Sequence, residues 1–192
     1  MEKNKKNKTL IYILTTRGFV IAMGIVFVAG YILMNTLVSD YFMSMSNGNA
    51  YVETNIFYAS SLGDILQAYG ETGRVCYIKL SVIFDFILPM QYSLFFVSCS
   101  ILLLKKFLNS KWQKALLLLG MVLCLSDWFE NIFIIFAIIN FPKINAFFPI
   151  MAQTMTLIKS AMSVLFLIIV FVSIVIWSAV RIKERKQIRI DQ

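Results

Sequence analysis

Three polar residues interrupt an apolar stretch in the second half of the chain. They are Asp127, Glu130 and Asn131, in the run S-D-W-F-E-N-I-F. Asp85 and Lys159 interrupt two other apolar stretches in the same way. Carboxylates in such surroundings can bind a cation, a lipid headgroup or another small ligand, or act as a base, while lysine can hold an anion or neutralise an acid. These residues are therefore the candidates for a functional site.

Charged side chains in an apolar segment must be compensated. Each costs about 2.5–3.5 kcal/mol at the centre of a bilayer, so three isolated carboxylates would cost ~8–10 kcal/mol, which is comparable to the stability of a whole domain. Lys159 can neutralise one acid and Arg74 can reach a second, which leaves at least one acid protonated, hydrated or open to a cation. The alternative is an internal brace between helices.

The segments that carry these residues are long enough to cross a bilayer. Hydrophobic residues make up 59% of the 192-residue chain, only 15% of residues are charged, and the mean hydropathy is +0.78. Soluble proteins have about a quarter of charged residues, and a transmembrane helix needs about 20 apolar residues. We expect an all-α integral membrane bundle, forming one domain, with four transmembrane helices at residues 18–38, 78–104, 115–139 and 150–180.

The basic residues predict how the chain is oriented. Fourteen of the eighteen basic residues precede the first span, lie in the inner loop at 105–114, or belong to the basic tail at 181–192. The positive-inside rule then places both termini and the inner loop in the cytoplasm. The loops at 39–76 and 140–149 are correspondingly outer loops. We expect a multi-pass protein of the cell (plasma) membrane.

Helical spacing places the polar residues of each span on one face. Asp85 and Tyr92 share a stripe in the second span, as Asp127 and Asn131 do in the third. At about 1.5 Å per residue, the buried acids and Lys159 all lie roughly 12–20 Å from the outer ends of their spans. The hypothetical ligand-binding residues are Asp85, Asp127, Glu130, Asn131, Lys159, Arg74, Tyr77 and Tyr92.

The second part of the outer loop, S-S-L-G-D-I-L-Q-A-Y-G, predicts a short amphipathic helix. Ser61 and Asp64 resemble a capping pair at its start, and Gly70 supplies a stop. Leu66 and Tyr69 lie on its apolar stripe. We expect this helix to lie on the outer membrane surface or to fold over the mouth of the bundle. The alternative is an ordered loop with no lid function.

Cysteine and histidine usage excludes several classes of protein. Cys76, Cys99 and Cys124 are too far apart for a C-x-x-C redox pair or for paired zinc ligands. The chain has no histidine, which excludes Ser–His and Cys–His nucleophiles and haem held by histidine. We expect no cofactor and no metal site, although three carboxylates could hold a hard cation. The net charge of +8 is accounted for by the basic membrane ends, so no nucleic-acid partner is expected.

Three strings in the middle of the chain carry a resemblance. They are G-R-V-C-Y at 73–77, D-F-I-L-P-M-Q-Y at 85–92 and D-W-F-E-N at 127–131. They resemble a pattern of small, uncharacterised bacterial four-helix multi-pass membrane proteins, GRxxY…DxxxPxxY…DxxEN, with which no activity is associated. Four-helix membrane thiol oxidoreductases are similar in outline, but their cysteine pairs are missing here. Tight-junction-like proteins are also similar in outline, but their W…G-L-W…C…C signature is absent.

Three classes of function fit these patterns. The first is a membrane protein in which the buried acids and Lys159, in the outer half of the bilayer, bind a small ligand, a cation or a lipid headgroup. Such binding could be one step of transport. The second is an accessory, assembly or immunity-type subunit whose polar cluster is structural. The third, less favoured, is an intramembrane enzyme acting on a lipid-linked substrate with Asp127 or Glu130 as base. The expected partners are the lipid bilayer, a lipid or small-molecule ligand, and another membrane protein or a second copy of the chain.

The predicted orientation can be tested by cysteine labelling in intact cells. In a background without the three native cysteines, Asn47→Cys should react with a membrane-impermeant maleimide, because residue 47 lies in the predicted outer loop. Asn109→Cys should react only after the membrane is permeabilised. The opposite pattern would invert the orientation and every depth given above.

Overall fold

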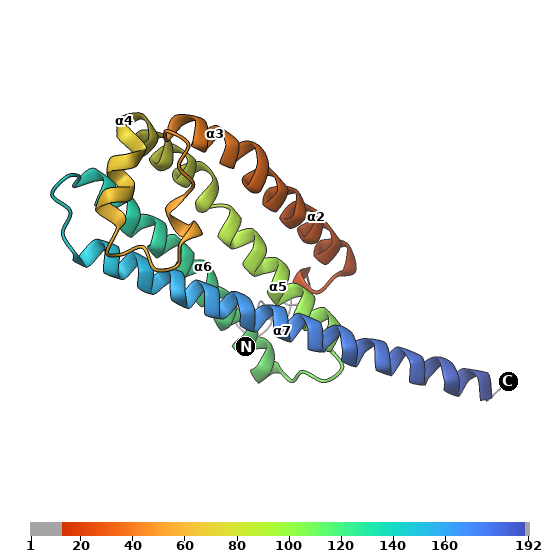
Figure 1. Cartoon of the computed structure of the whole chain (residues 1–192). Coiled ribbons are helices and arrows are strands. Elements are labelled where there is room, and N and C mark those ends of the chain that lie inside the picture. The colour runs from red at the N-terminus through yellow and green to blue at the C-terminus, as the bar shows by residue number, and fades with distance from the viewer. Residues whose placement is uncertain (1–12, 191–192) are drawn as a thin grey trace.

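The computed structural model describes residues 13–190, which are helical with no strand. This confirms the all-α prediction. Figure 1 shows long helices joined by short connections and by one longer loop. The elements, in chain order, are α2 (Arg17–Leu33), the π-helical turn η1 (Met34–Val38), α3 (Ser39–Met45), the 3₁₀ turn η2 (Val52–Thr54), α4 (Leu62–Leu80), the π-helical turn η3 (Ser81–Asp85), α5 (Leu88–Leu104), α6 (Ser110–Ile139) and α7 (Phe147–Ile190).

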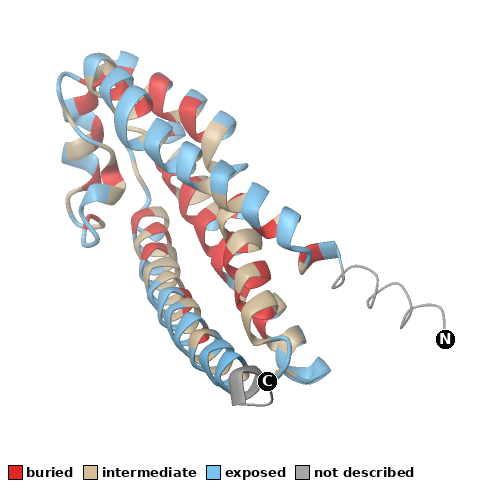
Figure 2. Ribbon diagram, turned by 90° about the vertical axis from the view of Figure 1, so that its right-hand side faces the viewer, coloured by how far each residue is buried: buried red, intermediate tan, exposed pale blue. Residues whose placement is uncertain are grey.

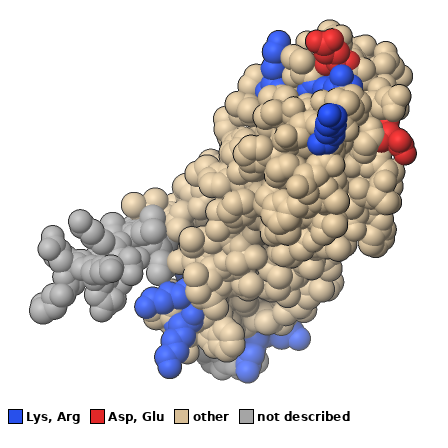
Figure 3. All heavy atoms as spheres, turned by 90° about the vertical axis from the view of Figure 1, so that its left-hand side faces the viewer, with Lys and Arg blue, Asp and Glu red and all other residues tan. Residues whose placement is uncertain are grey.

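Four helices are long and apolar enough to cross a membrane in the described part of the chain, as the sequence predicts. They are Arg17–Met45, Leu62–Leu104, Ser110–Ile139 and Phe147–Lys186. Figure 3 shows one face of the molecule, on which charged side chains gather at the two ends and a broad uncharged band lies between them. Residues 3–8 and 191–192, which contribute to the predicted orientation and tail, lie outside the described residues.

The first long helix continues beyond residue 38 into the segment assigned to the outer loop. No glycine or proline occurs from residue 31 to residue 47, so nothing in the backbone stops the helix there. It ends where Asn47 and Gly48 take positive φ angles of 57° and 81°, a conformation that an α-helix cannot contain. The connection that remains, residues 46–61, is called the 46–61 loop below.

Two breaks shape the second long helix. Gly70 adopts φ 65° and ψ 179°, which separates the stretch from Leu62 to Tyr69 from the rest of α4. Pro89 has no N–H to donate to the preceding turn, and the helix there passes through η3 and a turn before α5 begins. The Trp128 indole of α6 donates to the Phe86 carbonyl at 2.9 Å within this break. The break therefore holds Asp85 in a wide, irregular turn.

The stretch from Leu62 to Tyr69 packs inward in the structure. Leu62, Leu66 and Tyr69 are buried, together with Val52 and Tyr58 of the 46–61 loop. The capping pair predicted for its start is not formed, because the Ser61 hydroxyl donates to the Tyr58 carbonyl at 3.3 Å and makes no side-chain cap. The loop and this short helical stretch share one apolar core with the adjoining ends of the long helices.

The bundle is open along one side. α6 and α7 share the most extensive interface, and α5 packs against α2, α6 and α7, whereas α2 has no comparable contact with α6 or α7. Only 6% of the apolar window of the first span and 11% of that of the last are buried, against 44% and 50% for the middle two. Figure 2 shows this as exposed surface along α2 and α7 and buried positions along the central helices. Apolar surface of this extent suits a lipid environment.

The join between α4 and the 46–61 loop can be tested with two glycines of α4. A Cβ at Gly73 would lie 2.9 Å from the Ser46 Cα, whereas a Cβ at Gly63 would meet nothing within 4 Å. Gly73→Ala should therefore destabilise the protein by about 1–3 kcal/mol, the usual cost of overpacking. Gly63→Ala should be neutral or slightly stabilising because alanine favours helix. Thermal unfolding in detergent measures both, and equal midpoints would contradict this packing.

Candidate functional site

A cavity of about 340 Å³ lies where the 46–61 loop meets the long helices. Six segments form its wall: α2 with η1, the 46–61 loop, the break in the second long helix, α5, α6 and α7. Its lining residues include Phe27, Tyr31, Met34, Asn35, Tyr51, Glu53, Asp85, Gln91, Tyr92, Asp127, Asn131 and Lys159. Polar groups from these six segments thus converge on one space.

Lys159 of α7 joins two acids of α6. Its ammonium nitrogen lies 3.2 Å from Asp127 Oδ1 and forms a second, closer ion pair with Glu130. The Glu130 side chain is fully buried, with 0% exposed. Its other oxygen accepts a hydrogen bond of 2.7 Å from the Thr156 hydroxyl. One lysine therefore compensates two acids in the interface between α6 and α7.

Asp127 is held by two further side chains at the edge of the cavity. The Tyr92 hydroxyl of α5 donates to its Oδ2 at 2.5 Å, and the Asn131 amide donates to its Oδ1 at 3.2 Å. The Asn131 oxygen in turn receives a long contact of 3.5 Å from the Tyr77 hydroxyl. These hydrogen bonds fix the carboxylate in one orientation and leave it at the cavity wall.

Glu53, in the 46–61 loop, is a site residue that the sequence did not identify. The Tyr77 hydroxyl of α4 donates to its carboxylate in a short hydrogen bond, and Glu53 lines the cavity. Burial raises the pKa of Glu53 above its ordinary value, although the nearby Lys159 and the Tyr77 hydrogen bond act in the opposite direction. No periodic pattern surrounds Glu53, so nothing in its neighbourhood predicts that the loop turns inward.

The same loop is fastened to α7 by two hydrogen bonds. The Tyr58 hydroxyl and the Thr156 hydroxyl lie 3.0 Å apart, and the Ala59 N–H donates to the Gln153 side-chain oxygen at 2.8 Å. Burial is also the main cause that raises the pKa of the Tyr58 phenol, which stays protonated. Since Thr156 also donates to Glu130, the loop is linked to the buried ion pair through one hydroxyl.

Asp85 faces the cavity with less compensation than the other acids. It lines the cavity from η3, and Ser81, one turn earlier, is its polar neighbour. Among the side chains that the structure describes, those of residues 13–186, neither Asp85 nor Glu53 forms an ion pair. The cluster thus brings four carboxylates, from Glu53, Asp85, Asp127 and Glu130, to a single ammonium group, that of Lys159.

The structure does not bring all the sequence-based candidates together. Asp85, Tyr92, Asp127, Asn131 and Lys159 line the cavity. Glu130 and Tyr77 do not line the cavity themselves. Glu130 is paired with Lys159 and Tyr77 is hydrogen-bonded to Glu53, and these two partners do line it. Arg74 is elsewhere: its guanidinium donates to the Leu66 carbonyl at 2.8 Å and stacks 4.3 Å above the centre of the Phe141 ring.

Arg74 therefore does not compensate a second acid, as the sequence suggested that it could. Its side chain forms no ion pair among the described residues. The Leu66 carbonyl and the Phe141 ring hold the guanidinium away from the cavity. The acid excess at the cavity is accordingly larger than the sequence predicts.

The wall of the cavity combines carboxylates with aromatic rings, and both kinds of group attract positive charge. Tyr51, Tyr92, Tyr31 and Phe27 place ring surfaces beside the carboxylates, and ring faces attract organic cations. In the part of the chain that the structure describes, no group of three or more His, Cys, Asp or Glu side chains is arranged to hold a metal ion. A cation whose charge is spread over an ammonium group fits this lining.

Comparison of the chain with protein-family models, with curated protein sequences and with solved structures found no match. The resemblance to small bacterial four-helix membrane proteins therefore rests on the quoted motifs alone.

The shared ion pair predicts strong coupling between Lys159 and the acids of α6. Lys159→Met should lower the thermal midpoint in detergent sharply, since removing one member of a buried pair costs about 3–5 kcal/mol in soluble proteins. Adding Glu130→Gln should restore much of this loss, because the glutamine can still accept from Thr156. Asp127→Asn should restore less, since Asp127 keeps other partners.

The matched control is Lys106→Met, which removes a lysine from the exposed ion pair with Glu184. Its midpoint should stay within measurement error, because exposed pairs contribute little. If both Lys159 double variants unfold at the midpoint of Lys159→Met, the acids and the lysine do not form one cluster.

Proposed function

We propose that this chain is a multi-pass protein of the cell membrane, with both termini and the connection at 105–109 in the cytoplasm, and that its acidic cavity binds a small ligand carrying an ammonium group. The observation that carries the proposal is that three carboxylates, from Glu53, Asp85 and Asp127, line one cavity with a single ammonium group, that of Lys159, which also compensates Glu130 behind the wall. A ligand that brings a second positive charge would complete the compensation that Lys159 begins.

The argument for a cation starts from the cost of the acids. The ammonium group of Lys159 already forms ion pairs with Asp127 and Glu130. Its single positive charge therefore does not compensate Glu53 or Asp85 as well. A carboxylate inside a membrane-spanning bundle is expensive unless it is paired or protonated. A bound cation removes this cost, whereas an anion would add to it.

The lining also favours an organic cation of modest size. A volume of about 340 Å³ is near the lower end of small-ligand pockets, which span about 300–1,000 Å³. Tyrosine and phenylalanine faces bind quaternary ammonium groups through cation–π attraction. Asp85 and Glu53 would supply the counter-charge, and Tyr51 and Tyr92 the ring surfaces.

A second candidate is an accessory subunit in which the polar cluster is structural. The chain of contacts from Lys159 through Glu130 and Thr156 to Tyr58 favours it, because these groups hold α6, α7 and the 46–61 loop together without facing a ligand. This candidate leaves the charges of Glu53 and Asp85 unaccounted for. We therefore place it second.

Choline binding tests the proposal. In a maltoside detergent, which carries no ammonium, the purified chain should bind choline by calorimetry and should not bind 3,3-dimethyl-1-butanol, its uncharged isostere. Asp85→Asn and Glu53→Gln should each weaken choline binding about 10- to 100-fold, the range for a lost charged contact. Because the pKa of Glu53 is raised, binding should also weaken as the pH falls through that raised value and Glu53 becomes neutral.

The charge-matched control is Asp64→Asn, which removes an exposed acid of α4 that does not line the cavity. It should bind choline as the unmodified chain does. Equal binding of choline and its uncharged isostere, or equal losses in Asp64→Asn and Asp85→Asn, would contradict an ammonium site in this cavity.

A further inference from the structure

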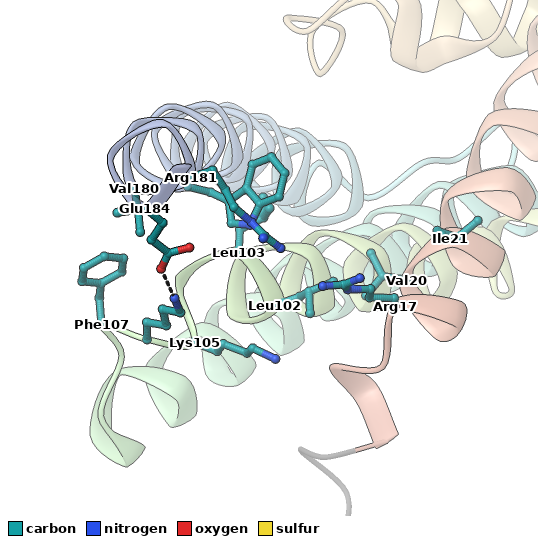
Figure 4. Close-up of a pocket in the computed structure, with 12 residues that line it drawn as sticks. Arg17, Val20, Ile21, Leu102, Leu103, Lys105, Phe107, Val180, Arg181 and Glu184 are labelled. Atoms are coloured by element: carbon teal, nitrogen blue, oxygen red, sulfur yellow. Dashed lines mark hydrogen bonds and ion pairs between the residues drawn. The ribbon is translucent and has the colours of Figure 1, made fainter. Parts of the chain in front are cut away.

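A second cavity lies at the opposite end of the molecule, between the first turns of α2, the end of α5 and the last part of α7. Its volume is about 450 Å³, and Arg17, Lys105, Lys106 and Arg181 line it together with Glu184. Figure 4 shows Arg17, Lys105 and Arg181 extending toward the same space from three separate elements. This cavity is called the basic pocket below.

The basic pocket keeps positive charge that no acid balances. Lys106 is paired with Glu184 at 2.5 Å. Within residues 13–186, whose side chains the structure describes, Arg17, Lys105 and Arg181 form no ion pair. Three cations held around one hollow repel one another, and an anion placed between them would relieve that repulsion. The pocket is therefore built for a negatively charged group.

The walls of the basic pocket are apolar. Val20 and Ile21 of α2, Leu102 and Leu103 of α5 and Val180 of α7 line it beside the cations, and the Ile21 side chain is 62% exposed. The Arg181 guanidinium lies 5.4 Å from the centre of the Trp177 ring. Tryptophan and arginine at the end of an apolar span are typical of the level of lipid headgroups.

We propose that the basic pocket binds the phosphate of an anionic phospholipid, with its acyl chains lying against the apolar surfaces of α2 and α7. Basic pockets between membrane helices on the cytoplasmic side bind such headgroups, and the side chains here combine phosphate-binding cations with a wall that suits hydrocarbon. A free phosphate would use the cations but would leave the apolar wall without a role. This inference rests on the membrane location and orientation of the proposed function but not on its ammonium site, because it uses different residues at the other end of the bundle.

Native mass spectrometry of the purified chain in detergent, titrated with phosphatidylglycerol, tests the site. The pocket variant combines Arg17→Gln, Lys105→Gln and Arg181→Gln. The matched control combines Lys111→Gln, Lys114→Gln and Lys183→Gln, which remove the same charge near the same end but do not line the pocket. Each basic residue near an anionic lipid contributes about fivefold in affinity. The pocket variant should therefore bind phosphatidylglycerol about 100-fold more weakly, and the control variant less than fivefold.

Phosphatidylcholine and inorganic phosphate separate the remaining outcomes. Phosphatidylcholine, which has no net charge, should bind weakly and equally to all three proteins. Equal losses of phosphatidylglycerol in both triple variants would reduce the effect to general electrostatic attraction and overturn the proposal. Binding of millimolar inorganic phosphate that displaces the lipid and disappears in the pocket variant would identify a soluble phosphate site instead. If the pocket variant does not fold, Lys105→Gln alone should lose about fivefold against Lys111→Gln, and no difference between these two would overturn the proposal.

Discussion

The ammonium group of Lys159, held between the carboxylates of Asp127 and Glu130, is the interaction on which the arrangement of this bundle depends. Glu130 is fully buried, and Lys159 reaches it across the most extensive helix interface in the molecule. In a low-dielectric interior an unpaired charge is far more costly than in water. α6 and α7 can therefore pack only in the register that brings these groups together, and the position of α7 in turn decides where the 46–61 loop finds its hydrogen-bond partners.

The 46–61 loop brings a further acid, Glu53, to the cluster around Lys159. Tyr58 and Ala59 fasten it to α7, while Tyr51 stacks on Phe42 with ring centres 4.2 Å apart. These contacts carry Glu53 inward to the hydroxyl of Tyr77. Since Tyr51 and Glu53 are part of the wall, the acidic cavity is complete only when the loop is in place. The loop is thus a structural part of the cavity and not only a connection between two spans.

Hydropathy was enough to predict the all-α class and the four long apolar helices, because the need to shield apolar length from water acts on each segment separately. Helical periodicity could also place Asp85 and Asp127 on inward faces. It could not find Glu53, whose position depends on the Tyr77 hydroxyl and on the contact between Tyr58 and Thr156, both made with residues far away in the sequence. The place of Arg74 at the start of the second span suggested a contact with the acids, whereas a carbonyl and a ring hold the guanidinium instead. Interactions between segments, and not within them, account for these differences.

The two π-helical turns at Met34–Val38 and Ser81–Asp85 each hold one residue more than a regular helix would need there. A π-helical turn accommodates one more residue than the α-helical turn it replaces, and one residue rotates an α-helix by about 100°. Deleting a single residue within either turn would restore an α-helical turn and leave the helix beyond it facing as before, whereas the same deletion elsewhere in the helix would rotate everything beyond it. Asn35 and Asp85 lie within these turns. A one-residue deletion, a change that evolution usually confines to loops, would here be absorbed inside a helix, and it would remove the widened turn that brings Asn35 or Asp85 to the acidic cavity while every apolar span stayed intact.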